Sequence, residues 1–126
     1  MIKLNAKKFN EGLKKMRKEL TPLEQYQQSV TETKVKKQIK EYLYIEQAAG
    51  RLFHFHILQG LGCFAGSPDR VLILPKGITI WLEVKKVMGK MSPAQKNFRE
   101  QCQNFGHHYL VVFSVDDLIT NLNCML

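Results

Sequence analysis

The chain has 126 residues, 44% of them hydrophobic and 24% charged, which excludes a disordered or fibrous protein and predicts one globular domain. No apolar run approaches the roughly 18–20 residues of a membrane span. No signal peptide begins the chain either, so we expect a cytoplasmic protein of a bacterium or a phage-infected cell, with no membrane partner. Three widely spaced cysteines suit a reducing compartment rather than a disulfide framework.

The net charge of +8 is concentrated in the N-terminal third. Residues 1–40 contain eleven Lys and Arg against four Glu, whereas residues 41–126 contain eight against seven Asp and Glu. A basic arm on a nearly neutral body suits a polyanionic partner, most commonly nucleic acid. The alternative is a solvated, partly helical tail that only aids solubility.

A helix is predicted from about Thr31, with apolar residues at helical spacing, and it should end near Gly50. The segment RLFHFHI at 51–57 alternates aromatic and histidine residues, which predicts a strand with His54 and His56 on its exposed face. The glycine-rich segment that follows, up to residue 69, is predicted to be a loop.

Residues 70–74 and 78–86 are predicted to form a hairpin around Pro75-Lys76-Gly77. A three-residue loop with Gly77 in the left-handed region pairs residue 70 with residue 82 and so places Asp69 opposite Glu83. Lys85 then follows on the same face. A two-residue loop would put the two carboxylates on opposite faces.

The remaining segments complete an α/β pattern. Ser92 and Pro93 begin a helix that ends at Gly106, a strand follows at residues 108–113, and a short helix begins after Ser114. The first of these helices has an apolar stripe, which we expect to pack on the sheet: Ala94, Phe98, Cys102 and Phe105. Because a strand, a helix and a strand over residues 78–113 form a right-handed crossover, the two strands should be parallel. The predicted order is αβββαβα, a mixed sheet with helices on both faces.

Two carboxylates facing each other across strands destabilise a sheet unless a positive charge lies between them. Lys85 neutralises part of that charge, and a hard divalent cation such as Mg²⁺ would neutralise the rest. Such a group suits phosphodiester hydrolysis. An ordinary salt bridge at the edge of the hairpin is the alternative, and spacing alone does not decide between the two. No Cys-x₂₋₄-Cys or His-x₃₋₅-His spacing supports zinc.

The motif Pro68-Asp69 followed by Glu83-Val84-Lys85 resembles the PD-(D/E)xK nuclease signature. Its context, GSPDRVLILPKG at 66–77, Gly89-Lys90 and then SPAQ at 92–95, resembles the VRR-NUC family of virus-type replication–repair nucleases over about residues 31–122. The resemblance implies a restriction-endonuclease-like αβββαβ core. It also implies a nuclease domain at 31–126 preceded by a basic helical extension at 1–30.

Roles carry over from the family at matching positions only. The resemblance implies that Asp69 and Glu83 bind Mg²⁺ or Mn²⁺ together with the backbone carbonyl of Val84, and that Lys85 is the catalytic lysine. Gln95 would correspond to the helix glutamine that fixes the lysine or the attacking water. Glu32 is the candidate for the glutamate of the first helix and would reach the metal through water, although other glutamates lie nearby: Glu24, Glu41 and Glu46.

The function that the resemblance implies is that of a metal-dependent DNA endonuclease, homodimeric and similar to Holliday-junction resolvases, acting on branched DNA. A flap or nicking nuclease with the same site is an alternative within the enzyme class. A non-catalytic basic DNA-binding module is the alternative outside it.

Overall fold

The computed structural model describes residue 22 and residues 31–125, so the expected basic extension at 1–30 lies almost wholly outside the described residues. The described elements follow the predicted order. They are α3 (Glu32–Ala48), β1 (Phe53–His56), β2 (Arg70–Leu74), a 3₁₀ turn (Pro75–Gly77), β3 (Ile78–Val84), α4 (Pro93–Asn104), β4 (His108–Val112) and α5 (Val115–Met125). None of the helices in this part of the chain is long and apolar enough to span a bilayer.

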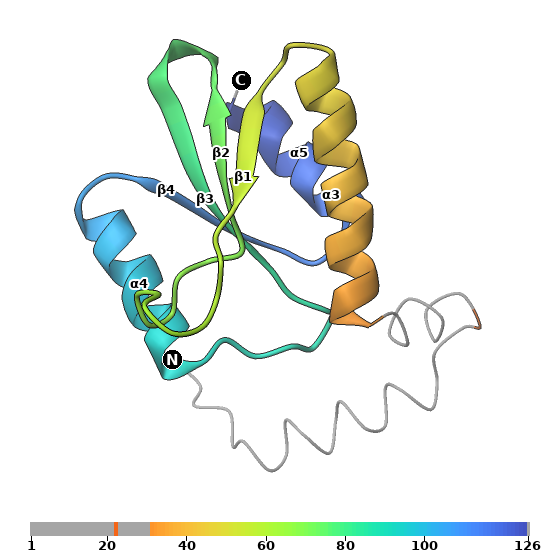
Figure 1. The fold of residues 1–126 in the computed structure, drawn as a ribbon. Coiled ribbons are helices and arrows are strands. Elements are labelled where there is room, and N and C mark those ends of the chain that lie inside the picture. The colour runs from red at the N-terminus through yellow and green to blue at the C-terminus, as the bar shows by residue number, and fades with distance from the viewer. Residues whose placement is uncertain (1–21, 23–30, 126) are drawn as a thin grey trace, which may run out of the picture. The chain divides into compact units, whose positions relative to one another are not determined.

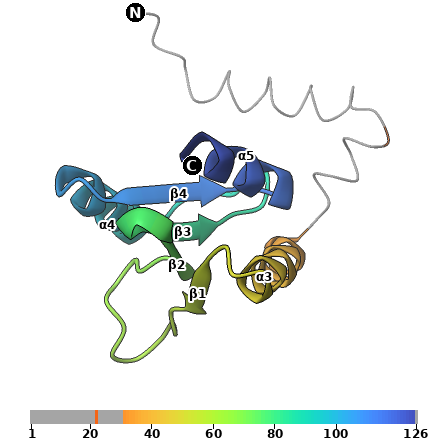
Figure 2. The same ribbon diagram turned by 90° about the horizontal axis from the view of Figure 1, so that it is seen from above.

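The four strands form one mixed sheet in the order β1-β2-β3-β4. β1 and β3 each pair antiparallel with β2, and β3 pairs parallel with β4, which confirms the predicted crossover. Helices α3 and α5 lie against one face and α4 against the other (Figures 1 and 2). The core lies mainly between the sheet and the α3–α5 pair, where Ile39, Leu43 and Leu118 are fully buried.

The β2–β3 hairpin has the predicted register. Arg70 pairs with Leu82 and Leu74 pairs with Ile78, across a turn in which both Lys76 (φ 66°) and Gly77 (φ 74°) adopt left-handed backbone conformations. Because Arg70 pairs with Leu82, this register places Asp69 and Glu83 together at the open end of the hairpin. Figure 1 shows that this end lies far from the turn between β2 and β3. The three-residue loop therefore sets the register that places the two carboxylates next to each other.

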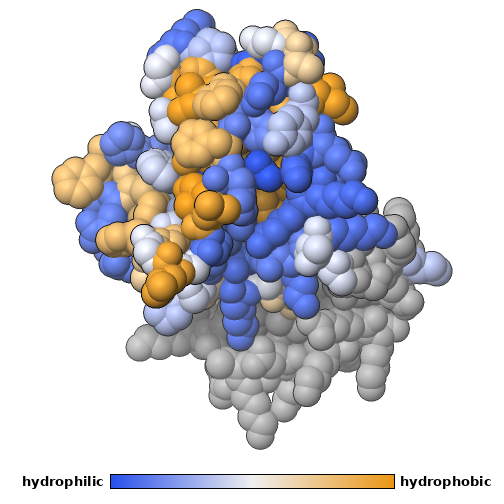
Figure 3. Space-filling view, in the orientation of Figure 1, coloured by the Kyte–Doolittle hydropathy of each residue, from blue (hydrophilic) through white to orange (hydrophobic). Residues whose placement is uncertain are grey.

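The prediction for the faces of β1 was wrong. His54 is 5% exposed, whereas Phe53 and Phe55 are 53% and 45% exposed. α3 covers the face that carries His54: the Tyr44 ring lies edge-on at 4.6 Å from the imidazole, and the Gln47 side chain accepts a hydrogen bond from the His54 N–H. Phe53 and Phe55 lie on the opposite face of this edge strand. Figure 3 shows hydrophobic residues exposed over the strands.

α4 packs on its own face of the sheet mainly through Phe98. The centroid of its ring lies 5.6 Å from that of Trp81 and 6.3 Å from that of Tyr109. The expected packing of Phe105 was wrong, because this residue caps the helix C-terminus and is 78% exposed. The N-terminus of α4 is tightly determined by a capping box between Ser92 and Gln95. Those two residues hold the first turn of α4 close to the open end of the hairpin.

Candidate active site

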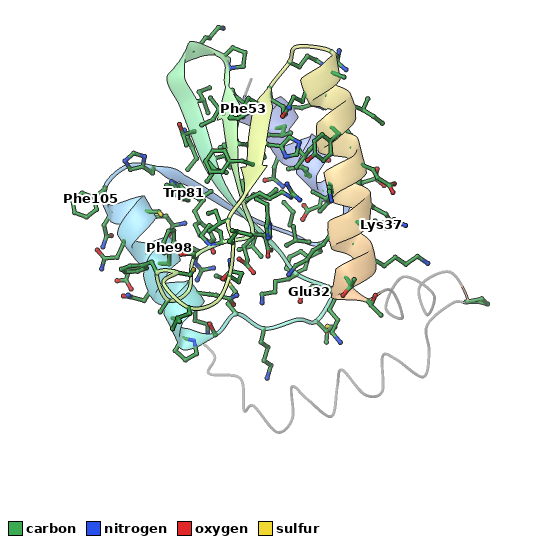
Figure 4. The ribbon with its side chains drawn as sticks, in the orientation of Figure 1. Glu32, Lys37, Phe53, Trp81, Phe98 and Phe105 are labelled. Atoms are coloured by element: carbon green, nitrogen blue, oxygen red, sulfur yellow. The ribbon has the colours of Figure 1, made fainter. Side chains whose placement is uncertain are left out.

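Three elements converge at the open end of the β2–β3 hairpin. The hairpin contributes Asp69 and Glu83, with Lys85 directly after β3, while α3 contributes Glu32 from its first turn and α4 contributes Gln95 from its own. Figure 4 shows Glu32 at the end of α3 that faces this region. All five side chains that the sequence singled out therefore come together, although they span more than sixty positions of the chain.

Glu83 is the most deeply buried charged residue of the group, at 2% exposure. Its Oε1 atom accepts a hydrogen bond from Gln95 Nε2 at 3.1 Å and lies 3.6 Å from Lys85 Nζ. Its Oε2 atom is buried without a hydrogen-bond partner among the described residues. Burial, and after it the negative charge of Asp69, raises the pKa of Glu83 from 4.5 to about 7.

Asp69 is also buried, and both of its oxygens have partners. Oδ2 accepts a hydrogen bond from the Val84 N–H at 2.8 Å, which ties the start of β2 to the end of β3. Oδ1 lies 3.0 Å from Lys36 Nζ. Burying a carboxylate costs several kcal/mol unless it is paired, so Lys36 stabilises Asp69 in the absence of any other cation.

Lys36 was not anticipated from the sequence. It lies one turn after Glu32 on α3, and its ammonium group is 3.9 Å from Glu32 Oε2 as well as close to Asp69. Partial burial lowers the pKa of Lys36, but its hydrogen bond to Asp69 and the nearby carboxylates outweigh this, so the pKa is raised overall. The i, i+4 spacing of Glu32 and Lys36 was visible in the sequence, but the approach to Asp69 depends on where α3 packs.

Glu32 also lies near the second lysine. Its Oε1 atom is 3.6 Å from Lys85 Nζ, the same distance that separates Lys85 Nζ from Glu83 Oε1. Lys85 therefore bridges the glutamate of α3 and the buried glutamate of β3. Its side chain is only 13% exposed, which keeps the ammonium group directed at these carboxylates.

Gln95 has two roles in the structure. Its Oε1 atom accepts a hydrogen bond from the Ser92 N–H at 2.9 Å as part of the capping box. Its Nε2 atom consequently faces the site and donates to Glu83. The helix cap thus orients the amide, and the amide orients the buried carboxylate.

The loop before Asp69 is anchored by two residues that the sequence did not single out individually. Gln59 Nε2 lies 3.2–3.4 Å from the backbone carbonyls of residues 57, 67 and 68, and so joins the two ends of the loop. At Gly66 (φ 82°) a Cβ atom would lie 2.2 Å from the Ala94 carbonyl oxygen, so no other residue fits there without moving α4. Both contacts set the position of Asp69.

The donor set suits a hard divalent cation. Among residues 31–125 no three His, Cys, Asp or Glu side chains form a metal-binding cluster by themselves. The two carboxylates and the Val84 carbonyl are oxygen donors, the kind that Mg²⁺ and Mn²⁺ prefer, and Glu83 Oε2 is a buried oxygen without a hydrogen-bond partner in this part of the chain. The residues present therefore fit such an ion.

Neither a family model nor a curated protein matches the chain. A solved structure of a VRR-NUC domain does match it, with a TM-score of 0.59 and 28% sequence identity, over 75% of this chain and 97% of that domain. The fold and site define a restriction-endonuclease-like α/β domain. In fold and in sequence, the chain is similar to VRR-NUC nuclease domains.

Proposed function

We propose that the protein is a divalent-metal-dependent endonuclease that hydrolyses phosphodiester bonds in DNA. The observation that carries this proposal is the environment of Glu83. Its carboxylate is buried beside a second carboxylate, is held by Gln95 and Lys85, and has one oxygen that no described residue contacts by a hydrogen bond. A strongly perturbed pKa in such a constellation is typical of functional sites and unfavourable as a purely structural arrangement.

In this proposal some residues of the site would bind the metal ion, and others would orient the reacting groups. Asp69, Glu83 and the Val84 carbonyl would hold Mg²⁺ or Mn²⁺, with Glu32 placed to contact it through water. When bound, such an ion stabilises negative charge on a phosphoryl group and lowers the pKa of water. Lys85 is held between Glu32 and Glu83 and would orient the attacking water or the scissile phosphate. Gln95 keeps Glu83 in position.

DNA is proposed as the substrate, with branched DNA preferred and a homodimer as the active form. The family resemblance supports all three, and the net charge of +8 supports a polyanionic substrate in particular. A dimer would supply two active sites, as paired cuts in a four-way junction require. A domain of this size that reads DNA shape needs few contacts to base edges.

The test is cleavage of end-labelled four-way junctions, flaps and plain duplex by the purified protein, with Mg²⁺, with Mn²⁺ and with EDTA. Wild type should give metal-dependent paired cuts in the junction. Asp69→Asn should lose at least about a hundredfold in rate while keeping DNA affinity, because the Asn oxygen still accepts from the Val84 N–H. Asp116→Asn, at an exposed position of α5, is the matched control and should cut normally.

Other outcomes would change the proposal in defined ways. Cuts confined to flaps or to one strand would keep the chemistry and replace the substrate by that of a flap or nicking nuclease. Tight DNA binding without cleavage under any metal would identify a non-catalytic DNA-binding module.

A further inference from the structure

A cationic pocket lies between α3 and the edge strand β1, next to the candidate active site but separate from it. It has a volume of about 510 Å³ and is lined by side chains of α3, β1 and the first residue of β2. Two of these, Lys40 and Arg70, are cations, and none of the lining residues is Asp or Glu. A pocket of this size and charge suits a phosphate-bearing ligand.

The two charged groups of the pocket, Lys40 and Arg70, are hydrogen-bond donors. Arg70 Nη1 lies 3.2 Å from His54 Nδ1, and a guanidinium group can only donate, so His54 Nδ1 accepts. Because Nδ1 accepts from Arg70, the proton of the neutral ring lies on Nε2. Burial, and after it the charge of Arg70, lowers the pKa of His54 and so favours this neutral form. That Nε2–H group is buried and has no partner among the described residues. Lys40 and Arg70 therefore bring charged N–H groups to the pocket, and His54 adds a buried N–H group without a partner in the described part of the chain.

Three aromatic side chains also line the pocket. Tyr44 lies one turn beyond Lys40 on α3, and Phe53 and Phe55 lie on β1, all three of them exposed. Figure 4 shows Phe53 on the strand side, while Lys37 points away from the sheet on the outer side of α3. Aromatic faces beside cations are the arrangement that binds unpaired nucleotides, because bases stack on rings while phosphates meet the charges.

The pocket is connected to the active site through the chain itself. Arg70 directly follows Asp69, and Lys40 lies one helical turn, about 6 Å, beyond Lys36 on α3. Lys36 in turn contacts Asp69. A strand whose phosphate lies at Asp69 could therefore continue along α3 past Lys36 to Lys40.

We propose that this pocket is a nucleotide subsite that holds an unpaired nucleotide of the DNA strand next to the scissile phosphate, its phosphate on Lys40 and Arg70 and its base against Tyr44. The inference rests on the proposed function and extends it. It gives the protein a means of preferring DNA with unpaired nucleotides near the cut, since a base in intact duplex is not available for stacking.

The experiment is the binding of a fluorescent poly(dT) of about 15 nucleotides by the full-length protein without divalent metal, over a range of salt concentrations. Lys40→Gln and Arg70→Gln should each weaken binding about fivefold at 0.1 M salt and reduce the salt slope by about 0.7. Tyr44→Leu should weaken binding at least about fivefold and leave the salt slope unchanged. Lys37→Gln, next to the pocket helix face but directed away from it, is the matched control and should retain wild-type binding.

Equal binding by all four variants and wild type would overturn the inference. It would also be overturned if the pocket variants changed only the oligomeric state, because the pocket would then be a contact between copies of the chain. Wild-type cleavage with Mg²⁺ is measured on the same preparations. If wild type cuts DNA and the pocket variants bind normally, the subsite is wrong while the nuclease proposal stands. If wild type neither cuts nor binds DNA, both fail.

Discussion

Glu83 occupies a place that favours its neutral form over its ionised one. Its carboxyl group lies near Asp69 and Glu32, and the two cations within the same group, Lys85 and Lys36, offset only part of the cost of burial. Because its folded-state pKa of about 7 exceeds the unfolded value of 4.5, the folded protein binds more protons between these values. Folding stability must therefore fall as pH rises from about 4.5 to 7.

Replacing Glu83 by Gln should remove this pH dependence. We expect Glu83→Gln to stabilise the metal-free protein at pH 8 by about 1–3 kcal/mol and to leave stability near pH 4 unchanged, while cleavage is abolished. Urea unfolding in EDTA at several pH values measures this, with Glu100→Gln, an exposed glutamate of α4, as control. Parallel stability–pH curves for Glu83→Gln and wild type would contradict the interpretation.

In the proposed metal site, Lys36 would compete with a divalent cation for Asp69. Its ammonium group lies 3.0 Å from the oxygen that the metal would need, so removing the charge should strengthen metal binding. We expect Lys36→Met to bind Mn²⁺ about five- to tenfold more tightly in calorimetric titrations without DNA. Lys37→Met should match wild type. Unchanged or weaker binding by Lys36→Met would mean that Lys36 does not occupy the place of the metal.

At the scale of elements, Gln95 links the N-terminal cap of α4 to the candidate site, because its side chain both caps the helix and donates a hydrogen bond to Glu83. Gln95→Ala loses both the cap acceptor and the donor to Glu83, whereas Ser92→Ala loses the hydroxyl cap but keeps the hydrogen bond between Gln95 and Glu83. Both variants should lose about 1 kcal/mol of stability. Only Gln95→Ala should lose activity, by about ten- to a hundredfold in kcat at saturating metal. Equal activity losses in the two variants would show that the contribution of Gln95 is only structural.

The comparison of β1 with the hairpin shows which features local sequence determines. The β2–β3 register follows from turn chemistry within a few residues of Gly77, and it was predicted correctly together with the meeting of Asp69 and Glu83. Which face of β1 is buried depends on where α3 lies, and alternation cannot supply that information, so the burial of His54 was missed. Lys36 was missed for the same reason, since its partner Asp69 is brought close only by tertiary packing.

For the whole molecule, the uneven charge predicts how DNA affinity responds to salt. Seven of the nineteen Lys and Arg residues lie within residues 1–20. Deleting residues 1–20 should weaken duplex binding and reduce the salt slope by about 0.9 for each phosphate that these residues neutralise. Fluorescence anisotropy at several salt concentrations measures this, and an unchanged slope would show that these residues do not bind DNA. Cleavage chemistry should persist, because the Asp69–Glu83 group lies within residues 31–125.

The β2–β3 hairpin carries the two carboxylates at its open end and an exposed turn at its other end. β3 has seven residues, so its turn lies about 20 Å from Glu83, and Lys76 at the tip is exposed. A dye-binding peptide inserted at Lys76, or a tether to a glass surface attached there, would lie at the end of the β2–β3 hairpin opposite the one that carries the carboxylates (Figure 1). Single molecules held in this way could be watched through successive encounters with DNA.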